Sequence, residues 1–135
     1  TMRKIEHIGI AVKDLDVSNA LFEKLFGAPA YKAEEVASEG VTTSFFMNGP
    51  NKIELLAATN PDSPIAKFIE KKGEGIHHIA FDVEDIVSEI ARLQQEGFVV
   101  LNETPKKGAD NKLVAFLHPK STNGVLIELC QEIPQ

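Results

Sequence analysis

One short motif occurs twice in the chain of 135 residues, and it constrains the fold more than any other feature. The two copies are Ile5-Glu6-His7-Ile8-Gly9-Ile10-Ala11-Val12 and Ile76-His77-His78-Ile79-Ala80-Phe81-Asp82-Val83. Each has an apolar residue, a polar residue, His, Ile and a small residue in that order, and each ends in Val. Because each copy is rich in β-branched residues and is followed by an acidic turn, each predicts a buried strand. A His at the same place in two copies suggests two halves of one site.

The elements after the motif also repeat, in the order strand, helix and three strands. In the first half we expect a strand over 4–12, a helix capped by Asp14 or Asp16, and strands over about 30–36, 41–47 and 52–56. In the second half we expect a strand over 76–83, a helix, strands over 98–101, 113–117 and 125–130, a loop over 105–111 and a frayed tail over 131–135.

A bridging helix is predicted between the two halves, over about 63–73, because Ser63 is a good N-cap and Pro64 suits the first helical position. The prediction is therefore one domain over 1–135 that contains two βαβββ modules, over about 4–58 and 76–131. Apolar residues at helical spacing predict the buried face of each helix. These stripes are Val17, Leu21, Leu25 and Phe26; Ile65, Phe68 and Ile69; and Ile86, Ile90 and Leu93.

Alternation of side chains across a strand assigns four polar residues to one kind of face. His7 and His78 lie opposite the apolar face of the opening strands, and Glu54 and Glu128 do the same in the closing strands. An unpaired carboxylate between apolar neighbours is costly to bury unless it meets a cation. If the first and last strands of each half are neighbours, all four side chains converge on one site. The alternative is four separate residues, with each Glu paired to a surface Lys.

Two imidazoles and two carboxylates suit one divalent ion such as Zn²⁺, Co²⁺, Ni²⁺ or Mn²⁺. His7, Glu54, His78 and Glu128 are therefore the predicted metal ligands. The adjacent His77 points with the other side of its strand, and we assign it no chemical role.

The bulk composition excludes several classes of function. A net charge of −6 argues against nucleic-acid binding, and no apolar run approaches the ~20 residues of a membrane span. The single Cys130 cannot form an internal disulfide, which indicates a reducing compartment. We therefore expect a cytoplasmic protein without membrane or nucleic-acid partners. A matrix protein without its transit peptide would have the same composition.

Further motifs point to a known family. They are Lys52-Ile53-Glu54-Leu55-Leu56, Asp62-Ser63-Pro64-Ile65-Ala66, Phe116-Leu117-His118-Pro119-Lys120-Ser121 and Gly124-Val125-Leu126-Ile127-Glu128-Leu129. Together with the repeated motif, they make the chain similar to the vicinal oxygen chelate superfamily and, within it, to the methylmalonyl-CoA epimerases. The resemblance covers nearly the whole chain. It implies an α+β, glyoxalase-like fold, in which paired βαβββ modules form curved mixed sheets around a metal.

The resemblance also implies an activity. Epimerases of this kind interconvert the R and S forms of methylmalonyl-CoA by removing the α-proton through a metal-stabilised enolate, and a homodimer is common among them. We therefore expect an isomerase with an acyl-CoA substrate and one divalent metal ion. Lys120 and Ser121 are candidates for binding the substrate carboxylate. A local basic patch, made of Lys106, Lys107, Lys112 and Lys120, is a candidate for the phosphates of coenzyme A.

One position departs from part of the family. Some members carry Gln at the second ligand position and a non-ligand Glu on the strand after the Gly-Val turn, whereas this chain has Glu54 and Thr43 there. Our hypothesis is that Glu54 and Glu128 are both metal ligands and the catalytic proton acceptors.

Three alternatives remain open. A glyoxalase I-type lactoylglutathione lyase has the same ligand set, although the segment His118-Pro119-Lys120-Ser121 speaks against it. A non-catalytic small-molecule-binding member of the superfamily would hold no metal. An extradiol dioxygenase usually has one carboxylate with two His and a longer chain.

Overall fold

The computed structural model describes residues 1–134 and separates into two compact units. The first unit is His7–His77, and the second unit combines Thr1–Glu6 with the residues from His78 onward. Strands β1 (Met2–Ala11) and β5 (Gly75–Val83) each contribute residues to both units. None of the helices among residues 1–134 is both long and apolar enough to cross a membrane. The single-domain organisation stays a prediction.

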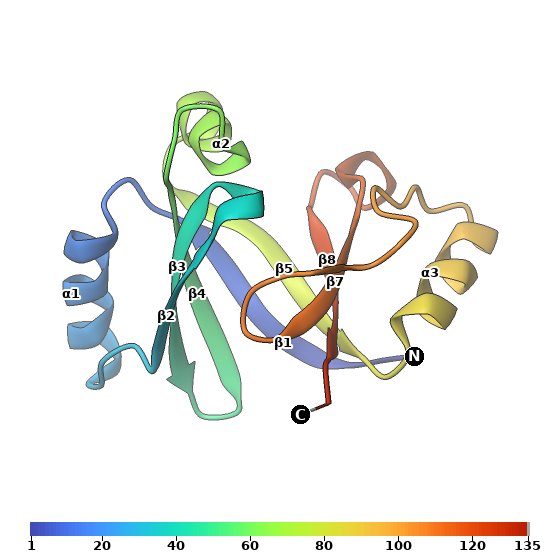
Figure 1. The fold of residues 1–135 in the computed structure, drawn as a ribbon, viewed down its shortest axis with the longest axis horizontal. Coiled ribbons are helices and arrows are strands. Elements are labelled where there is room, and N and C mark those ends of the chain that lie inside the picture. The colour runs from blue at the N-terminus through green and yellow to red at the C-terminus, as the bar shows by residue number, and fades with distance from the viewer. Residues whose placement is uncertain (135) are drawn as a thin grey trace. The chain divides into compact units, whose positions relative to one another are not determined.

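The first unit contains a four-stranded sheet in the order β2-β3-β4-β1. Its other strands are β2 (Lys32–Val36), β3 (Val41–Asn48) and β4 (Asn51–Ala58). Strands β1 and β4 run parallel, and the other neighbours are antiparallel. Figure 1 shows helix α1 (Leu15–Phe26) alongside the strands of this unit. The opening and closing strands of this module are therefore neighbours, which meets the condition for bringing His7 and Glu54 together.

Helix α1 begins and ends where the sequence predicts. Asp14 is the N-cap and accepts a hydrogen bond from the backbone N–H of Val17 at 3.1 Å, and Gly27 ends the helix with a left-handed φ of 75°. The predicted buried stripe, however, is wrong for three of its four members: Val17, Leu21 and Leu25 are 65%, 62% and 67% exposed.

A second stripe of α1 packs on the sheet instead. It consists of Leu15, Phe22 and Phe26, which contact a core that includes Phe46 and Leu55. Positions separated by seven and eleven residues return to almost the same side of a helix, whereas Val17 and Leu21 lie on the opposite side. Two Phe rings bury more apolar area than Val and Leu, so the aromatic stripe takes the core face.

The opposite face of this sheet is covered in part by helix α2 (Pro64–Lys72). Ser63 caps it by accepting from the backbone N–H of Ile65, and Gly73 follows its last turn. Ile65, Phe68 and Ile69 pack on residues of β1, β3 and β4. The predicted bridging helix and its buried stripe are therefore confirmed.

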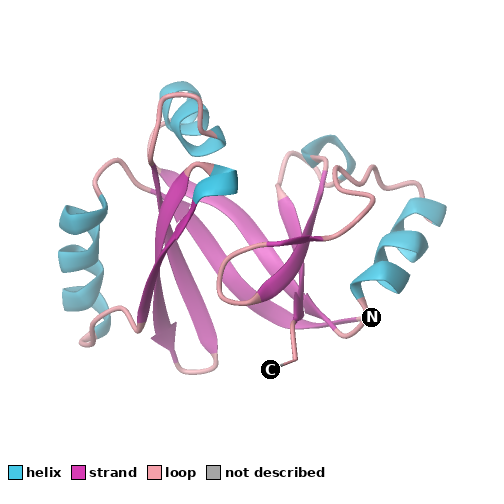
Figure 2. Ribbon diagram, in the orientation of Figure 1, coloured by secondary structure: helices cyan, strands magenta, loops and turns pink. Residues whose placement is uncertain are grey.

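The second unit has the strand order β5-β8-β7-β6, with β5 and β8 parallel. Its remaining strands are β6 (Lys106–Lys107), β7 (Lys112–Leu117) and β8 (Ile127–Glu132). Helix α3 (Ile86–Gln95) buries Ile86, Ile90 and Leu93 against this sheet, as predicted. Figure 2 distinguishes these strands from the loops and short helices that join them.

The predicted strand over 98–101 is wrong. Only an isolated bridge between Val100 and Leu117 forms there, and the short strand β6 lies inside the predicted loop over 105–111. Strand β6 forms because the chain reverses before β7 through a short loop, in which Asp110 and Asn111 both have a left-handed φ of 56°. Across this loop the backbone N–H of Gly108 donates to the carbonyl of Lys112 at 2.9 Å, which extends the pairing of β6 with β7. The predicted frayed tail is also partly wrong, because β8 runs to Glu132; Gln135 lies outside the described residues.

Candidate metal centre

Each unit contains one buried His–Glu pair. In the first unit, the parallel register of β1 and β4 places Gly9 opposite Glu54, so His7 lies two residues away on the same face. His7 Nε2 is 3.2 Å from Glu54 Oε1, and both residues are 5% exposed. Gly9 has no side chain to separate the carboxylate from the imidazole.

The second unit repeats this arrangement. Strands β5 and β8 are parallel, Ala80 lies opposite Glu128, and His78 precedes Ala80 by two residues. His78 Nε2 is 3.0 Å from Glu128 Oε1, and the two residues are 3% and 6% exposed. A small residue again lies opposite the carboxylate. In both strands, the small residue of the pattern His-Ile-small therefore leaves room for the imidazole to reach the carboxylate.

An aromatic ring accompanies each pair, and neither ring is predicted by alternation within the strands that carry His and Glu. Phe45 of β3 lies opposite Glu54, and Phe116 of β7 lies opposite Glu128. The rings meet His7 and His78 edge to face, with centroid distances of 6.3 Å and 6.0 Å. Such contacts favour one orientation of the imidazole and exclude water from it. The available signal was the matching Phe in the strand before each closing strand.

One further polar contact occurs in the first unit. Thr43 is fully buried, and its Oγ1 donates a hydrogen bond to Glu54 Oε2 at 2.8 Å. Both oxygens of Glu54 therefore have a close neighbour, His7 at Oε1 and Thr43 at Oε2.

The donor set of each pair fits a divalent metal ion. Imidazole nitrogen and carboxylate oxygen are the ligands that borderline ions such as Zn²⁺ and Co²⁺ accept. A buried carboxylate also requires compensation of its charge. The burial of Glu54 and Glu128 creates this requirement in each unit, and a metal ion held together with the neighbouring imidazole of His7 or His78 would meet it.

His77, which precedes His78 in the second copy of the motif, contacts a helix. The ring of His77 packs edge to face on Phe68 of α2, with centroids 4.9 Å apart. His77 thus makes a packing contact with α2, and its lack of a chemical role stays a prediction.

The predicted substrate-binding residues lie in the short 3₁₀ helix Pro119–Ser121 after β7. Lys120 is exposed. Ser121 Oγ accepts a hydrogen bond from the backbone N–H of Val99 at 3.0 Å, and His118 Nδ1 accepts one from that of Lys120 at 3.0 Å. His118 is therefore a turn residue, and Ser121 Oγ helps to hold the segment before β6.

The four Lys residues of the predicted basic patch differ in position. Lys106 lies opposite Val114 in register, and alternation puts it on the same face as Phe116 and Glu128. Lys107 is exposed and alternates to the other face, whereas Lys112 is buried. The four Lys residues therefore do not form a single exposed basic surface within the second unit.

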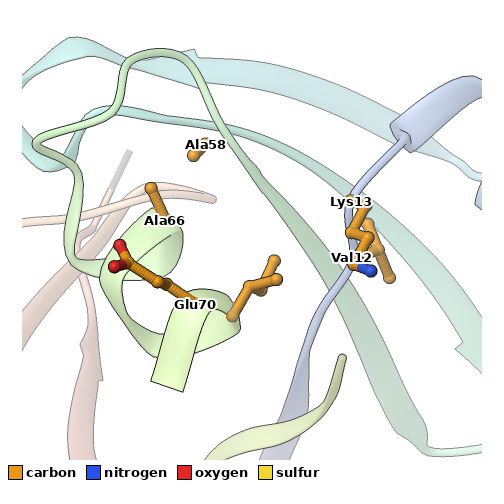
Figure 3. Close-up of a pocket in the computed structure, with 6 residues that line it drawn as sticks. Val12, Lys13, Ala58, Ala66 and Glu70 are labelled. Atoms are coloured by element: carbon orange, nitrogen blue, oxygen red, sulfur yellow. The ribbon is translucent and has the colours of Figure 1, made fainter. Parts of the chain in front are cut away.

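A separate cavity of about 360 Å³ lies in the first unit, between the ends of β1 and β4 and helix α2 (Figure 3). Val12, Ala58, Ala66 and Ile69 supply apolar walls, and Lys13 and Glu70 lie at its rim. Ala58 comes four residues after Glu54 along β4, so this cavity lies beyond the His7–Glu54 pair.

Comparison with known proteins gives the family. The model of the glyoxalase/bleomycin resistance protein/dioxygenase superfamily matches residues 6–116. The chain therefore belongs to the glyoxalase/bleomycin resistance protein/dioxygenase superfamily. The predicted fold class and the resemblance to the vicinal oxygen chelate proteins are confirmed.

The chain is similar over nearly its whole length to named epimerases. An ethylmalonyl-CoA/methylmalonyl-CoA epimerase of Cereibacter sphaeroides is 43% identical over 130 residues, which are 95% of this chain and 97% of the relative. The crystal structure of methylmalonyl-CoA epimerase from Mycobacterium tuberculosis has a TM-score of 0.94 at 33% identity and covers 98% of this chain and 90% of its own.

A third similar structure contains a ligand. It is a methylmalonyl-CoA epimerase in complex with methylmalonyl-CoA and NH4+, with a TM-score of 0.93, 34% identity and coverage of 98% of this chain and 96% of its own. These three similar proteins are named as epimerases, which are isomerases, the enzyme class expected from the motifs.

Proposed function

We propose that the protein is a metal-dependent epimerase that interconverts the R and S forms of methylmalonyl-CoA. The observation that carries the proposal is the pair of buried His–Glu contacts, one in each unit, in a chain of this superfamily. The names of the relatives and the acyl-CoA ligand of one similar structure support the substrate class.

In this proposal His7, Glu54, His78 and Glu128 together bind one divalent ion, Co²⁺, Zn²⁺, Ni²⁺ or Mn²⁺. When bound, such an ion supplies a Lewis acid that stabilises the enolate of the thioester. The support is the donor set, because each unit offers one buried imidazole and one buried carboxylate.

The chain itself moves the proton. We assign Glu128 and Glu54 as proton acceptors: one carboxylate oxygen takes the α-proton, the electron pair of the C–H bond remains in the enolate, and a carboxyl on the opposite face returns a proton to the same carbon. Burial beside Phe45 and Phe116 keeps water from competing for the proton. Inversion at the α-carbon is the net result.

Lys120 and Ser121 are assigned to substrate binding. The ammonium of Lys120 is exposed and matches an anionic partner, either the substrate carboxylate or a phosphate of coenzyme A. The hydroxyl of Ser121 accepts one hydrogen bond and still has its own proton to donate.

The activity is tested by incubating the metal-loaded protein with methylmalonyl-CoA in D₂O and following deuterium at the α-carbon. Wash-in together with loss of optical purity is the expected result. Formation of lactoylglutathione from the glutathione hemithioacetal would favour a glyoxalase I activity instead. Absence of bound metal and of both activities would favour a non-catalytic binding protein.

The assignment of the carboxylates is tested by Glu54→Gln and Glu128→Gln, both of which should abolish turnover. Glu132→Gln is the matched control, because Glu132 is an exposed carboxylate on the same strand as Glu128. Retained epimerisation by both ligand variants would contradict the proposed mechanism.

A homodimer and a cytoplasmic location complete the proposal. The single Cys130 supports a reducing compartment. Light scattering of the purified protein measures the subunit number, and a monomer at micromolar concentration would contradict the dimer.

A further inference from the structure

We propose that Thr43 is a positioning residue that fixes the carboxylate of Glu54 as a metal ligand. This inference rests on the proposed function and deepens it. It assigns a role to a residue at which the chain departs from those family members that have Glu there.

The contact that carries the inference lies within β3 and β4. Thr43 and Phe45 are on the same face of β3, and Phe45 lies directly opposite Glu54. The Thr43 hydroxyl reaches diagonally across the two strands to Glu54 Oε2, at 2.8 Å, in a fully buried position. A charge-assisted O–H···O⁻ bond of this kind is stronger than a neutral one.

The contact leaves the two oxygens of Glu54 with different neighbours. Oε2 accepts from Thr43, and Oε1 faces His7 at 3.2 Å. A partial rotation of the carboxylate plane about its terminal bond would move the accepting oxygen away from the Thr43 hydroxyl and break the hydrogen bond. The hydroxyl therefore holds the carboxylate plane of Glu54 in the orientation that keeps one oxygen beside the imidazole of His7. Partners of this kind around metal ligands typically affect metal affinity by 10–100-fold (about 1.4–2.7 kcal/mol).

The position in the second unit that corresponds to Thr43 has no hydroxyl group. Val114 precedes Phe116 by two residues, as Thr43 precedes Phe45, and Phe116 lies opposite Glu128 as Phe45 lies opposite Glu54. The side chain of Val114 is buried and has no hydrogen-bond donor. The position that matches Thr43 in the second unit therefore offers no hydroxyl to Glu128, whereas Thr43 offers one to Glu54.

The test compares Thr43→Val, which keeps the shape of the side chain and removes the hydroxyl, with Thr43→Ser, which keeps the hydroxyl. Thr42→Val is the matched control, because Thr42 is the adjacent residue on the other face of β3. Each purified protein is titrated with Co²⁺ in a calorimeter, its Co²⁺ absorption spectrum is recorded, and the metal-free form is melted.

The expected result is a Co²⁺ affinity about 10–100-fold weaker and an altered Co²⁺ spectrum for Thr43→Val. Thr43→Ser should recover most of the affinity and the spectrum of the parent protein, and Thr42→Val should match the parent in both. A Thr43→Val variant that melts at a lower temperature without metal, yet keeps the parent's affinity and spectrum, would overturn the inference, since the hydroxyl would then serve the fold alone.

The same titration separates this inference from the proposed function. If the parent protein binds Co²⁺ and epimerises its substrate while Thr43→Val behaves identically, the role of Thr43 is wrong and the function stands. If the parent binds no divalent ion, the proposed metal-dependent function is wrong, and the role of Thr43 is wrong with it.

Discussion

Gly9 and Ala80 lie opposite Glu54 and Glu128, and their small size lets an imidazole reach each carboxylate. A larger side chain at either position would fill the space beside the carboxylate. Ala80 is fully buried on the same face as His78, so this requirement is strict in the second unit.

We predict that Ala80→Val destabilises the protein by about 1–3 kcal/mol through overpacking and weakens metal binding. Urea denaturation and Co²⁺ titration measure the two effects. Ala91→Val, at an exposed position of α3, is the control and should leave Co²⁺ binding unchanged. Normal metal binding by Ala80→Val would show that the small residue is unnecessary for the His78–Glu128 contact.

A second prediction concerns Lys120. Lys120→Met should raise KM for methylmalonyl-CoA about tenfold and leave kcat nearly unchanged, because a charge that binds substrate and transition state equally affects KM alone. Steady-state kinetics at low and moderate salt measure this. Lys107→Met removes a similar exposed charge from β6 and should have little effect. A fall in kcat with constant KM would contradict the assignment.

For single residues, the sequence identifies those that occur at the same place in both halves. It does not identify residues whose contacts depend on how neighbouring strands pair. Alternation identifies His7, Glu54, His78 and Glu128 as one kind of position, and the structure pairs them within each unit as that reasoning requires. Thr43 and Phe45 remained unassigned because their contacts depend on the antiparallel register of β3 and β4. That register is set by the turn between those strands, and strand patterning alone does not specify it.

Among the helices, α1 has two apolar sides and only one of them packs on its sheet. The exposed side carries Val17, Leu21 and Leu25, and the packed side carries Leu15, Phe22 and Phe26. Spacing alone predicts that the aliphatic side is buried, because Val17, Leu21 and Leu25 follow a regular i, i+4 pattern. The larger apolar area of the Phe rings selects the side that packs on the sheet. Helical periodicity counts apolar positions and takes no account of side-chain size.

Substitutions in α1 distinguish the two sides. Phe22→Ala should destabilise the protein by about 3 kcal/mol, since it leaves a cavity beside Phe26 and Phe46. Leu21→Ala should change the free energy of unfolding by no more than about 0.5 kcal/mol. Denaturant unfolding measures both. Equal effects of the two substitutions would contradict the packing of α1.

Helix α3 contains a buried acid that depends on a neighbour three residues away. Glu89 is 1% exposed, and its Oε1 accepts a hydrogen bond from Arg92 Nε at 2.7 Å. That bond lowers the pKa of Glu89 below its ordinary value, against the opposing effect of burial. A carboxyl with a lowered pKa in the folded state adds stability above its unfolded pKa and loses this contribution as the pH falls.

Arg92→Met should therefore destabilise the protein by about 1–3 kcal/mol near pH 7, because a buried charge loses its donor. The difference from the parent should shrink as the pH falls below the ordinary Glu value of 4.5. Melting curves from pH 7 to pH 3 measure it. A difference that is constant across this range would show that Arg92 acts through packing of its stem instead.

For the whole molecule, metal binding should add to stability, because an ion that binds only the folded chain favours it. At a free concentration of 100 times Kd, the gain is about 2.7 kcal/mol. Adding a chelator should lower the melting temperature and abolish epimerisation, and Co²⁺ should restore both. Glu54→Ala, which removes one proposed ligand, should show a smaller shift on chelation. No shift in the parent protein would contradict the metal site.

The order of elements over the whole chain is largely visible in the sequence, because the strands and helices follow clear periodicity and caps. The exception is the segment between α3 and β7, where Asp110 and Asn111 form a tight turn and create β6. Non-Gly residues with positive φ are uncommon, so this turn is hard to foresee from patterning.

Strand β1 also determines when the chain can finish folding. Met2 packs in the core of the second unit, and Arg3 binds Asp82, 79 residues further along the chain, at 2.8 Å. During synthesis, Met2 and Arg3 leave the ribosome well before their partners in the second unit have been made. Contacts of such long range slow the folding of a domain, since a large loop has to close before they form. Residues His7–His77 can begin to pack earlier, so the N-terminal end of β1 remains an unprotected strand edge until the second unit has been made.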